Sequence, residues 1–586
     1  MKRLNTLKDR LGGFVGRPTR ESGAPTESSR RRWFSLRWLS QGKAGELFGA
    51  DLRSLAVFRI VLACVVLMDL ASRATNLRAH YTDQGVLPRG DVLRYLDSWR
   101  WSLNMINGTL TFQAFLFGLA ALACVALLLG YRTRLMTIVI WVLLVSIQAR
   151  NPLVNNAGDN FLRLLLLWSI LLPLGACWSL DSQVKASRLQ SLSTRFLSFA
   201  TLGLFLQIAF MYWFTVALKS NRAWHEDGTA LYFALGARQV TRPLGEYLHQ
   251  FPDLLGILTW ATIRLEIIAP ILLFCPIFTG PVRTLAAISI VSLHVGIALT
   301  MDIGVFPWTS ALCMVCVLPD WFWDTALPKV RAVLLSWTPI THRIGGSVSR
   351  PIRAYWPFPR TGLAMWGAMR YSSTPGFESA APVEGGTMRP NFLQAAPQSP
   401  LKPDRIAVLG ASALTNVLAA ICLLFVFAWN MSTIGKFTLP QPALPVSSVF
   451  GLYQRWDMFA PRPPGATSWH VVVGVLQDGR LVDLMNPILR NDLDQIADVS
   501  WEEPDNIASK VYKDEYWRKY WERLATPGTT PQTETFAGYA CRGWNGHHDG
   551  ETELASLDIY LLSKSTLPNA QSGPVQLTLL GTHRCL

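Results

Sequence analysis

Nine apolar segments constrain the fold of this 586-residue chain more than any other feature. A helix needs about 20 predominantly apolar residues to cross the hydrocarbon core of a bilayer. The pattern predicts a mainly α fold, a polytopic transmembrane helical bundle of about nine spans. The third and eighth segments are short, so the number of spans depends on whether these two cross. The segments lie at about 54–73, 111–130, 135–149, 161–178, 196–218, 254–275, 283–301, 304–319 and 408–430.

The composition agrees with a membrane protein that carries some soluble mass. Hydrophobic residues make up 50% of the chain and charged residues only 16%, against about 25% charged in soluble domains. Such values exclude a disordered, collagen-like or disulfide-scaffold protein. The net charge is +15, and its excess lies in residues 1–53 and 325–405, which flank apolar segments. Anionic lipid headgroups, and not nucleic acid, are therefore the expected counter-charges.

The basic residues also predict an orientation, because Lys and Arg concentrate in cytoplasmic loops. We expect a cytoplasmic N-terminus, and an odd number of spans then places residues 431–586 outside. The first apolar run begins far from Met1, so a cleavable signal peptide is not expected. The predicted location is the inner or plasma membrane, which the chain crosses several times.

The last 150 residues differ from the rest of the chain. Within 469–484, two strand-like runs flank Asp478-Gly479, a hairpin turn signal. Residues 505–524 have aromatic residues at helical spacing, and 557–563 and 575–580 resemble further strands. The predicted parts are a basic cytoplasmic tail at 1–50, an eight-helix membrane domain at 51–325, a cytoplasmic loop at 326–405 that is disordered over 372–404, a ninth transmembrane helix at 406–432, and an extracytoplasmic α+β domain at 433–586.

Cysteine usage fits this division. Seven of the nine cysteines lie in or beside apolar segments, where they behave as small apolar residues. Cys541 and Cys585 lie in the predicted outer domain, where an oxidising compartment allows them to form a disulfide. The chain has no metal-binding spacing such as HxxxH or HExxH, and no Walker loop or GxSxG elbow. Neither a metal nor a nucleotide is therefore expected as a cofactor.

Ionisable residues at membrane depth are the main candidates for function, because burying them is unfavourable. Lys219 ends the aromatic-rich run 205–218 and is followed by Trp224 in a polar loop. A lysine at the end of a span often extends to the interface. Alternatively, apolar surroundings disfavour the ammonium form, and a neutral amine can act as a general base. Glu266 lies within a span, where it can pair with a base or become protonated, and His294 is either a hydrogen-bonded core residue or a functional one.

A polar segment between two apolar helices is the second candidate. It contains three asparagines, Asn151, Asn155 and Asn156, and ends at Asp159. Asp159 is placed to cap the following helix, and Arg163 is four residues further on, at the spacing of an ion pair. The segment is either a tight polar turn or an amide-rich mouth that hydrogen-bonds a substrate.

Three blocks of sequence resemble the HTTM family of bacterial membrane proteins, which is related to vitamin K-dependent γ-carboxylase. The resemblance covers roughly residues 50–325, and a weaker one covers 454–461. The blocks are Phe58-Arg-Ile-Val with His80-Tyr-Thr-Asp-Gln-Gly-Val-Leu-Pro88; Gln148-Ala-Arg-Asn-Pro-Leu-Val-Asn-Asn-Ala-Gly-Asp159 with Leu172-Pro-Leu-Gly; and Leu293-His-Val-Gly-Ile-Ala-Leu with Gly304-Val-Phe-Pro-Trp308.

The resemblance implies chemistry driven by a lysine base. In the γ-carboxylases such a lysine deprotonates a hydroquinone, and oxygenation gives a strongly basic alkoxide. The alkoxide removes a proton from a substrate glutamate, carbon dioxide adds, and the quinone leaves as an epoxide. Lys219 looks like the catalytic lysine, and His294 looks like a histidine before the Phe-Pro segment. Residues 151–159 have Asn where the animal enzymes have a His, and no propeptide-binding region matches, so quinol oxygenation is better supported than carboxylation.

Three functions therefore remain open. The first is an enzyme that acts on a reduced quinone or a secreted peptide, with Lys219 and His294 as catalytic residues. Its substrate-binding candidates are Asn151, Asn155, Asn156, Asp159, Arg163, Trp224 and Glu266. The second is a non-catalytic maturation or export factor that binds a secreted client through its outer domain. The third is a transporter that uses the same buried charges as a relay. The sequence defines no oligomeric state.

Overall fold

The computed structural model describes residues 41–94, 98–185, 195–337, 409–525, 530–567 and 571–585. The chain forms two compact units, one of Met1–Ala326 with Ala407–Leu586 and the other of Leu327–Ile406. In the second unit the described element is α17 (Leu327–Trp337), a single helix. The predicted disordered segment 372–404 and most of the basic tail lie outside the described residues.

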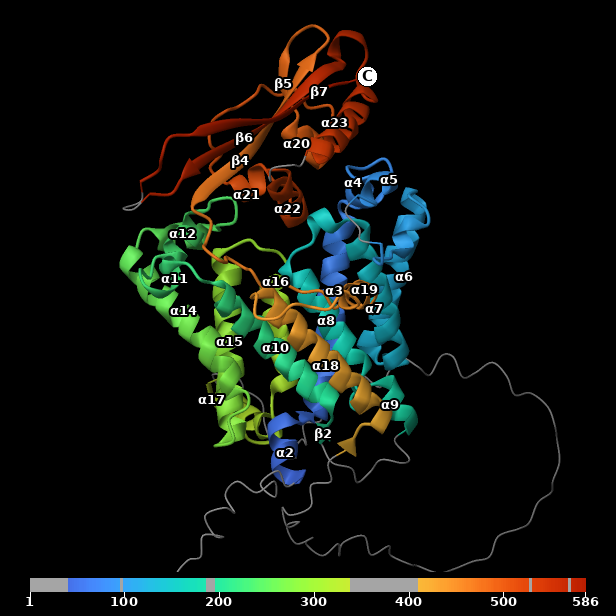
Figure 1. Ribbon diagram of the computed structural model, residues 1–586, viewed down its shortest axis with the longest axis vertical. Coiled ribbons are helices and arrows are strands. Elements are labelled where there is room, and N and C mark those ends of the chain that lie inside the picture. The colour runs from blue at the N-terminus through green and yellow to red at the C-terminus, as the bar shows by residue number, and fades with distance from the viewer. Residues whose placement is uncertain are drawn as a thin grey trace, which may run out of the picture. The chain divides into compact units, whose positions relative to one another are not determined.

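Among the described residues of the first unit, seven helices are long and apolar enough to cross a membrane, which confirms a mainly α, polytopic bundle (Figure 1). α3 packs against α6, α6 against α7, and α10 against both α14 and α18. The helices are α3 (Leu52–Ala74), α6 (Leu110–Leu129), α7 (Thr133–Arg150), α10 (Phe199–Leu218), α14 (Pro252–Leu272), α15 (Thr279–Thr300) and α18 (Ala413–Thr433).

Two of the nine predicted spans are helices too short to cross by themselves. α8 (Ala157–Ile170) has 14 residues, and α16 (Phe306–Cys313) continues as the 3-10 turn η6 (Met314–Val317). α8 begins at Ala157, earlier than predicted, because Asn156 and Asp159 form a capping box there. It is short because it ends at Ile170, shortly before Pro173. The third segment, expected to be short, is an 18-residue helix.

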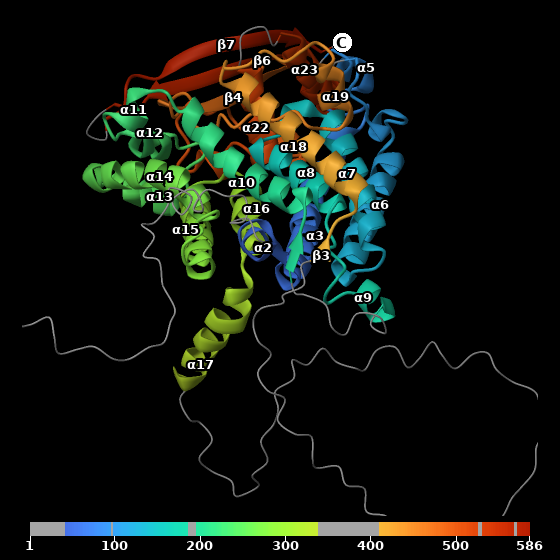
Figure 2. The ribbon, with the colours of Figure 1, turned by 60° about the horizontal axis from the view of Figure 1, so that its bottom comes forward.

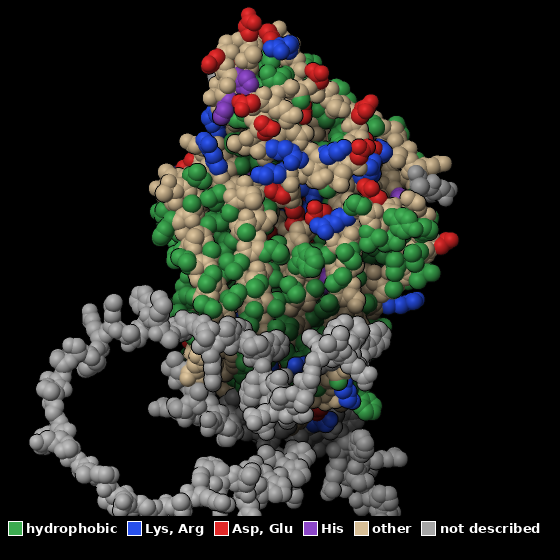
Figure 3. All heavy atoms as spheres, turned by 180° about the vertical axis from the view of Figure 1, so that it is seen from behind, with side chains coloured by type: hydrophobic (Ala, Val, Ile, Leu, Met, Phe, Trp, Pro, Cys, Tyr) green, Lys and Arg blue, Asp and Glu red, His purple; other side chains and the backbone are tan. Residues whose placement is uncertain are grey.

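Helix α8 lies at the centre of the bundle. Its apolar side chains point in every direction and are almost completely buried, among them Phe161, Leu165 and Trp168. A helix that is apolar all round belongs in an interior. The lipid-facing helices behave differently, since α6 exposes Phe115 and Leu122. Figure 3 shows apolar side chains over the spanning helices and charged ones gathered beyond their end.

The C-terminal part of the chain is an α+β domain, as predicted. Its antiparallel sheet has the order β5-β4-β6-β7, and α23 (Thr530–Asn545) packs on it. The predicted hairpin turn is present at Asp478-Gly479, where Gly479 has a φ of +85°. Cys541 and Cys585 form a disulfide with a Cα–Cα distance of 5.5 Å. The strands are β4 (Ala466–Leu476), β5 (Leu481–Asp483), β6 (Leu554–Ser565) and β7 (Gln576–Arg584).

The single helix predicted at 505–524 is instead two helices, α21 (Ile507–Lys510) and α22 (Glu515–Leu524). The break arises because Asp514 starts a new helix by accepting a hydrogen bond from the backbone N–H of Trp517. In Figures 1 and 2, α22 lies between the sheet and the spanning helices. It packs against the 3-10 turn η4 (Pro152–Val154).

The C-terminal domain and the loops of the membrane domain share one hydrophobic core. Val86, Leu87 and Val154 are buried in the same cluster as Trp517 and Trp521 of α22. The helix α2 (Gln41–Phe48) lies at the end of the spanning helices that is opposite to the C-terminal domain (Figure 1). There, the short strands β1 (Ala50–Asp51), β2 (Arg195–Leu197) and β3 (Leu409–Gly410) form a small sheet that the sequence did not predict.

Candidate active site in an apolar cavity

The backbone of α10 places Lys219 directly after its last turn. The Lys219 N–H closes the helix by donating to the carbonyls of Thr215 and Val216. The residue is only 3% exposed, so the amine lies inside the protein and does not extend to the membrane surface. Its Nζ donates to both carboxylate oxygens of Glu266 on α14, at 2.9 and 2.7 Å.

An aromatic ring completes the surroundings of this amine. The Trp224 ring centroid lies 4.2 Å from Nζ of Lys219, and its indole N–H donates to the carbonyl of Phe459. An aromatic face stabilises a nearby ammonium group by a cation–π interaction. Lys219, Glu266 and Trp224, which the sequence singled out separately, therefore form one cluster.

His294 forms a second polar pair beside this cluster. Its Nε2 lies 2.7 Å from the hydroxyl of Tyr212, and Phe306 lies edge-on to its ring at 5.5 Å between centroids. The Nδ1 atom of His294 is buried and has no hydrogen-bond partner among the described residues. Sequence reasoning missed Tyr212. It could have been found by its spacing, because Tyr212 precedes Lys219 by seven residues, about two helical turns, and so shares its face.

Both pairs line one cavity of about 300 Å³. Lys219, Glu266, Tyr212 and His294 are its ionisable residues, and most of the remaining wall is apolar, including Phe306 and Phe459. This combination of a largely apolar wall with a few convergent polar groups is typical of sites for small molecules. The arrangement can bind an apolar molecule and exchange a proton with it.

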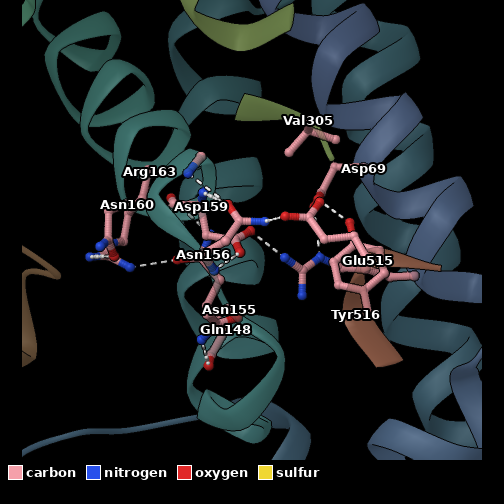
Figure 4. Close-up of polar contacts among 12 residues, drawn as sticks. Asp69, Gln148, Asn155, Asn156, Asp159, Asn160, Arg163, Val305, Glu515 and Tyr516 are labelled. Atoms are coloured by element: carbon pink, nitrogen blue, oxygen red, sulfur yellow. Dashed lines mark hydrogen bonds and ion pairs between the residues drawn. The ribbon is translucent and has the colours of Figure 1, made fainter. Parts of the chain in front are cut away.

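The polar segment at 151–159 does not reach this cavity. The Asn151 side chain donates to the carbonyl of His80 at 3.0 Å, and that of Asn155 donates to the carbonyl of Gln148 at 2.7 Å. Asn156 caps α8, and its Nδ2 donates to Glu515 of α22 at 2.9 Å (Figure 4). These hydrogen bonds hold the turn against the membrane domain and against α22 of the C-terminal domain.

The predicted ion pair between Asp159 and Arg163 is wrong. Asp159 instead pairs with Arg73 of α3, which also binds Asp69 at 2.9 Å. Arg163 donates to the carbonyl of Gly451 and to the side chain of Gln148. The reason is that Asp159 occupies the first turn of α8, where its second oxygen caps the backbone N–H of Asn156. Figure 4 shows Asp69 and Asp159 within the polar network that reaches Glu515 and Tyr516 of α22.

Among the described residues, no group of three or more His, Cys, Asp or Glu side chains is arranged to hold a metal ion. Cys313 and Cys316 are buried, free thiols at the α16–η6 junction.

The apolar helices and their exposed belt define an integral membrane protein that crosses the bilayer several times. Residues 49–321 match the family model of the HTTM domain, so this part of the chain is an HTTM domain. The match agrees with the predicted resemblance at about 50–325 and includes Lys219, Glu266 and His294. No curated protein and no solved structure matches the chain.

Proposed function

We propose that this HTTM-domain protein is an enzyme that removes a proton from an apolar hydroxyl compound, with a reduced quinone as the substrate. The observation that carries the proposal is the buried pair of Lys219 and Glu266, which faces an apolar cavity together with His294 and Tyr212. A cavity of about 300 Å³ suits a single ring system.

Lys219 acts as the base in this proposal. As the substrate binds, Lys219 passes one proton to Glu266 along their hydrogen bond, which leaves the amine able to accept a proton. The neutral amine accepts the substrate proton and becomes an ammonium group, while Glu266 keeps the proton that it received from Lys219. The new ammonium is held by the Trp224 ring and by the negative charge left on the substrate.

His294 and Tyr212 position the substrate. The unpartnered Nδ1 of His294 is available to a substrate oxygen, and the Tyr212 hydroxyl fixes the orientation of the imidazole ring. A bound reduced quinone supplies an acidic hydroxyl and an anion that reacts with oxygen. The resemblance to γ-carboxylase supports such oxygenation to an epoxide, with carboxylation of a peptide as a further step.

The same proposal includes an orientation in the plasma or inner membrane. Residues 1–53 carry twelve Lys and Arg residues, which favours a cytoplasmic N-terminus. The described part of the chain has seven long helices, or nine with the two short ones, and both numbers are odd. Together with a cytoplasmic N-terminus, either number supports an extracytoplasmic C-terminal domain, where an oxidising compartment would favour its disulfide.

The test compares membranes that carry wild type, Lys219→Ala or Lys436→Ala, supplied with reduced quinone and oxygen. Lys436 is an exposed lysine after α18 and serves as a matched control. We expect epoxide formation by wild type and the control, and a loss of at least about 100-fold in Lys219→Ala, as for removal of a general base. Equal activity in all three proteins, or no epoxide with any quinone tested, would contradict the proposal.

A second candidate function is the binding of a secreted client by the C-terminal domain. The surfaces expected to serve it, at 469–484 and 505–524, are largely buried, as Trp469, Tyr516 and Tyr520 illustrate. The edge strand β7 is a better surface, because Leu577 and Leu579 are 56% and 52% exposed. An apolar edge strand can accept an extended peptide as a further strand. Replacing Leu577 and Leu579 of β7 with lysine should then abolish client secretion and leave quinol turnover intact, whereas Lys219→Ala should abolish quinol turnover.

A further inference from the structure

A second and larger cavity lies between the C-terminal domain and the HTTM domain. Its volume is about 780 Å³. The walls come from α22, from residues 152–160 at the start of α8, and from the segment 453–465 that leads into β4. Because the cavity adjoins the start of α8, at the end of the apolar bundle that carries the C-terminal domain, we expect it to lie near the lipid headgroups.

The charges on this cavity are strongly unbalanced. Its lining includes six cations and three carboxylates, Asp457, Glu515 and Glu522. The cations are Arg100, Arg455, Arg462, Arg518, Lys519 and Arg523. An excess of cations in a concave site attracts anions, because the low-dielectric walls focus the field.

The carboxylates are already engaged by some of these cations. Asp457 pairs with Arg455 at 2.8 Å, and Glu522 pairs with Arg518 and with Lys519. Arg518 also lies 3.8 Å from Glu515. The three carboxylates of the cavity wall therefore interact with only some of the six cations, and the cavity keeps an excess of positive charge.

Arg523 and Arg462 supply that remaining charge. The Arg523 guanidinium donates to two backbone carbonyls, those of Pro152 and Asn155, both at 2.7 Å. Burial lowers the pKa of Arg523, and the negative charges of Glu522 and Asp159 oppose this shift. Arg462 is exposed and has no ion-pair partner among the residues that the structure describes.

The second cavity adjoins the Lys219 cavity. Ile303, Phe306, Met458 and Phe459 line both cavities and form an apolar partition between them. An anionic group in the basic cavity therefore has hydrocarbon-like surface at its side. A charged group joined to an apolar chain fits this environment better than a fully polar molecule does.

We propose that the basic cavity binds a phosphate group, supplied by an anionic phospholipid of the surrounding bilayer. Cations from three separate segments can meet several oxygens at once, which suits a phosphate better than a group with a single acceptor. Free inorganic phosphate shares this chemistry and is the other source. The proposal is independent of the Lys219 chemistry, since it assigns a different ligand to a different cavity.

The test measures binding to the full-length protein in a neutral detergent by calorimetry. The probes are dihexanoyl phosphatidylglycerol, the zwitterionic dihexanoyl phosphatidylcholine and inorganic phosphate. We expect saturable binding of phosphatidylglycerol and weaker binding of phosphatidylcholine. If inorganic phosphate binds as tightly as phosphatidylglycerol, the phosphate site stands and its source is free phosphate.

Variants decide whether the basic cavity is the binding site. Arg462→Gln should raise the Kd for phosphatidylglycerol about tenfold, as for the loss of one charge-assisted hydrogen bond. Glu515→Gln should lower the Kd, because it removes a carboxylate that competes for Arg518. Arg480→Gln is the control, because Arg480 pairs with Asp478 in the β4–β5 turn and does not line the cavity.

Several outcomes would overturn the proposal. They are the absence of saturable binding, equal affinities in Arg462→Gln and wild type, and binding of an acidic peptide such as hexaglutamate in place of every phosphate probe. Arg462 is exposed, so its replacement should leave the fold intact. A thermal unfolding curve that matches wild type checks this point.

Discussion

Replacing Glu515 with glutamine should make the protein more stable at alkaline pH. The Glu515 side chain begins α22 and is buried against the HTTM domain, where it accepts a hydrogen bond from Asn156 at 2.9 Å. Burial raises the pKa of Glu515 from 4.5 to about 7. Arg518 and Lys519 oppose this shift, whereas the negative charges of Asp159 and Asp302 add to it.

The direction of the pH effect follows from the raised pKa. The folded protein holds the Glu515 proton more tightly than the unfolded chain does, so this residue lowers stability as the pH rises from about 4.5 to about 7. A shift of about 2.5 pH units at 1.36 kcal/mol per unit corresponds to roughly 3 kcal/mol. Glutamine does not titrate and keeps an oxygen that can accept the bond from Asn156.

The assay is denaturant unfolding of the purified protein in detergent, followed by tryptophan fluorescence at pH 5, 6, 7 and 8. Trp517 and Trp521 of α22 are buried and report on this region. We expect the stability of Glu515→Gln relative to wild type to grow by about 2.5 kcal/mol between pH 5 and pH 8, because part of the effect is already present at pH 5. The control is Glu551→Gln, an exposed carboxylate in the same domain. A difference between Glu515→Gln and wild type that stays constant with pH would refute the reasoning.

Three further changes test other parts of the structure. Arg73→Ala leaves Asp69 and Asp159 buried without their shared cation, so it should destabilise the protein by about 3–5 kcal/mol; an unfolding midpoint equal to that of wild type would contradict the network. Joint replacement of Cys541 and Cys585 by serine opens a loop with a sequence separation of 44, and it should lower the stability of the C-terminal domain by about 4 kcal/mol. Wild type under reducing conditions should lose the same stability. If reductant does not change the stability of wild type, the disulfide is contradicted. Tyr212→Phe removes the hydroxyl that is hydrogen-bonded to His294, and it should reduce the stability of the protein by about 1 kcal/mol. It should also lower the rate of quinol turnover more than the affinity for quinol. A turnover rate equal to that of wild type would show that Tyr212 does not position His294.

The sequence by itself determined where helices, strands and chemistry-bearing residues lie along the chain. The apolar runs predicted the spanning helices, because the length of an apolar segment is a local property that a bilayer selects directly. Asp478-Gly479 predicted the hairpin, since a positive φ favours glycine there. Lys219 and His294 stood out because ionisable residues are rare at membrane depth.

Only the tertiary structure decided which of these residues meet. Glu266 lies 47 residues from Lys219 and Tyr212 lies 82 from His294, and nothing local to either sequence position selects its partner. Asp159 forms an ion pair with Arg73 and not with Arg163, because helix capping fixes the direction of its carboxylate. The basic cavity likewise combines three segments far apart in the chain. Packing between elements sets such contacts, whereas the pattern along one element sets only which face a residue occupies.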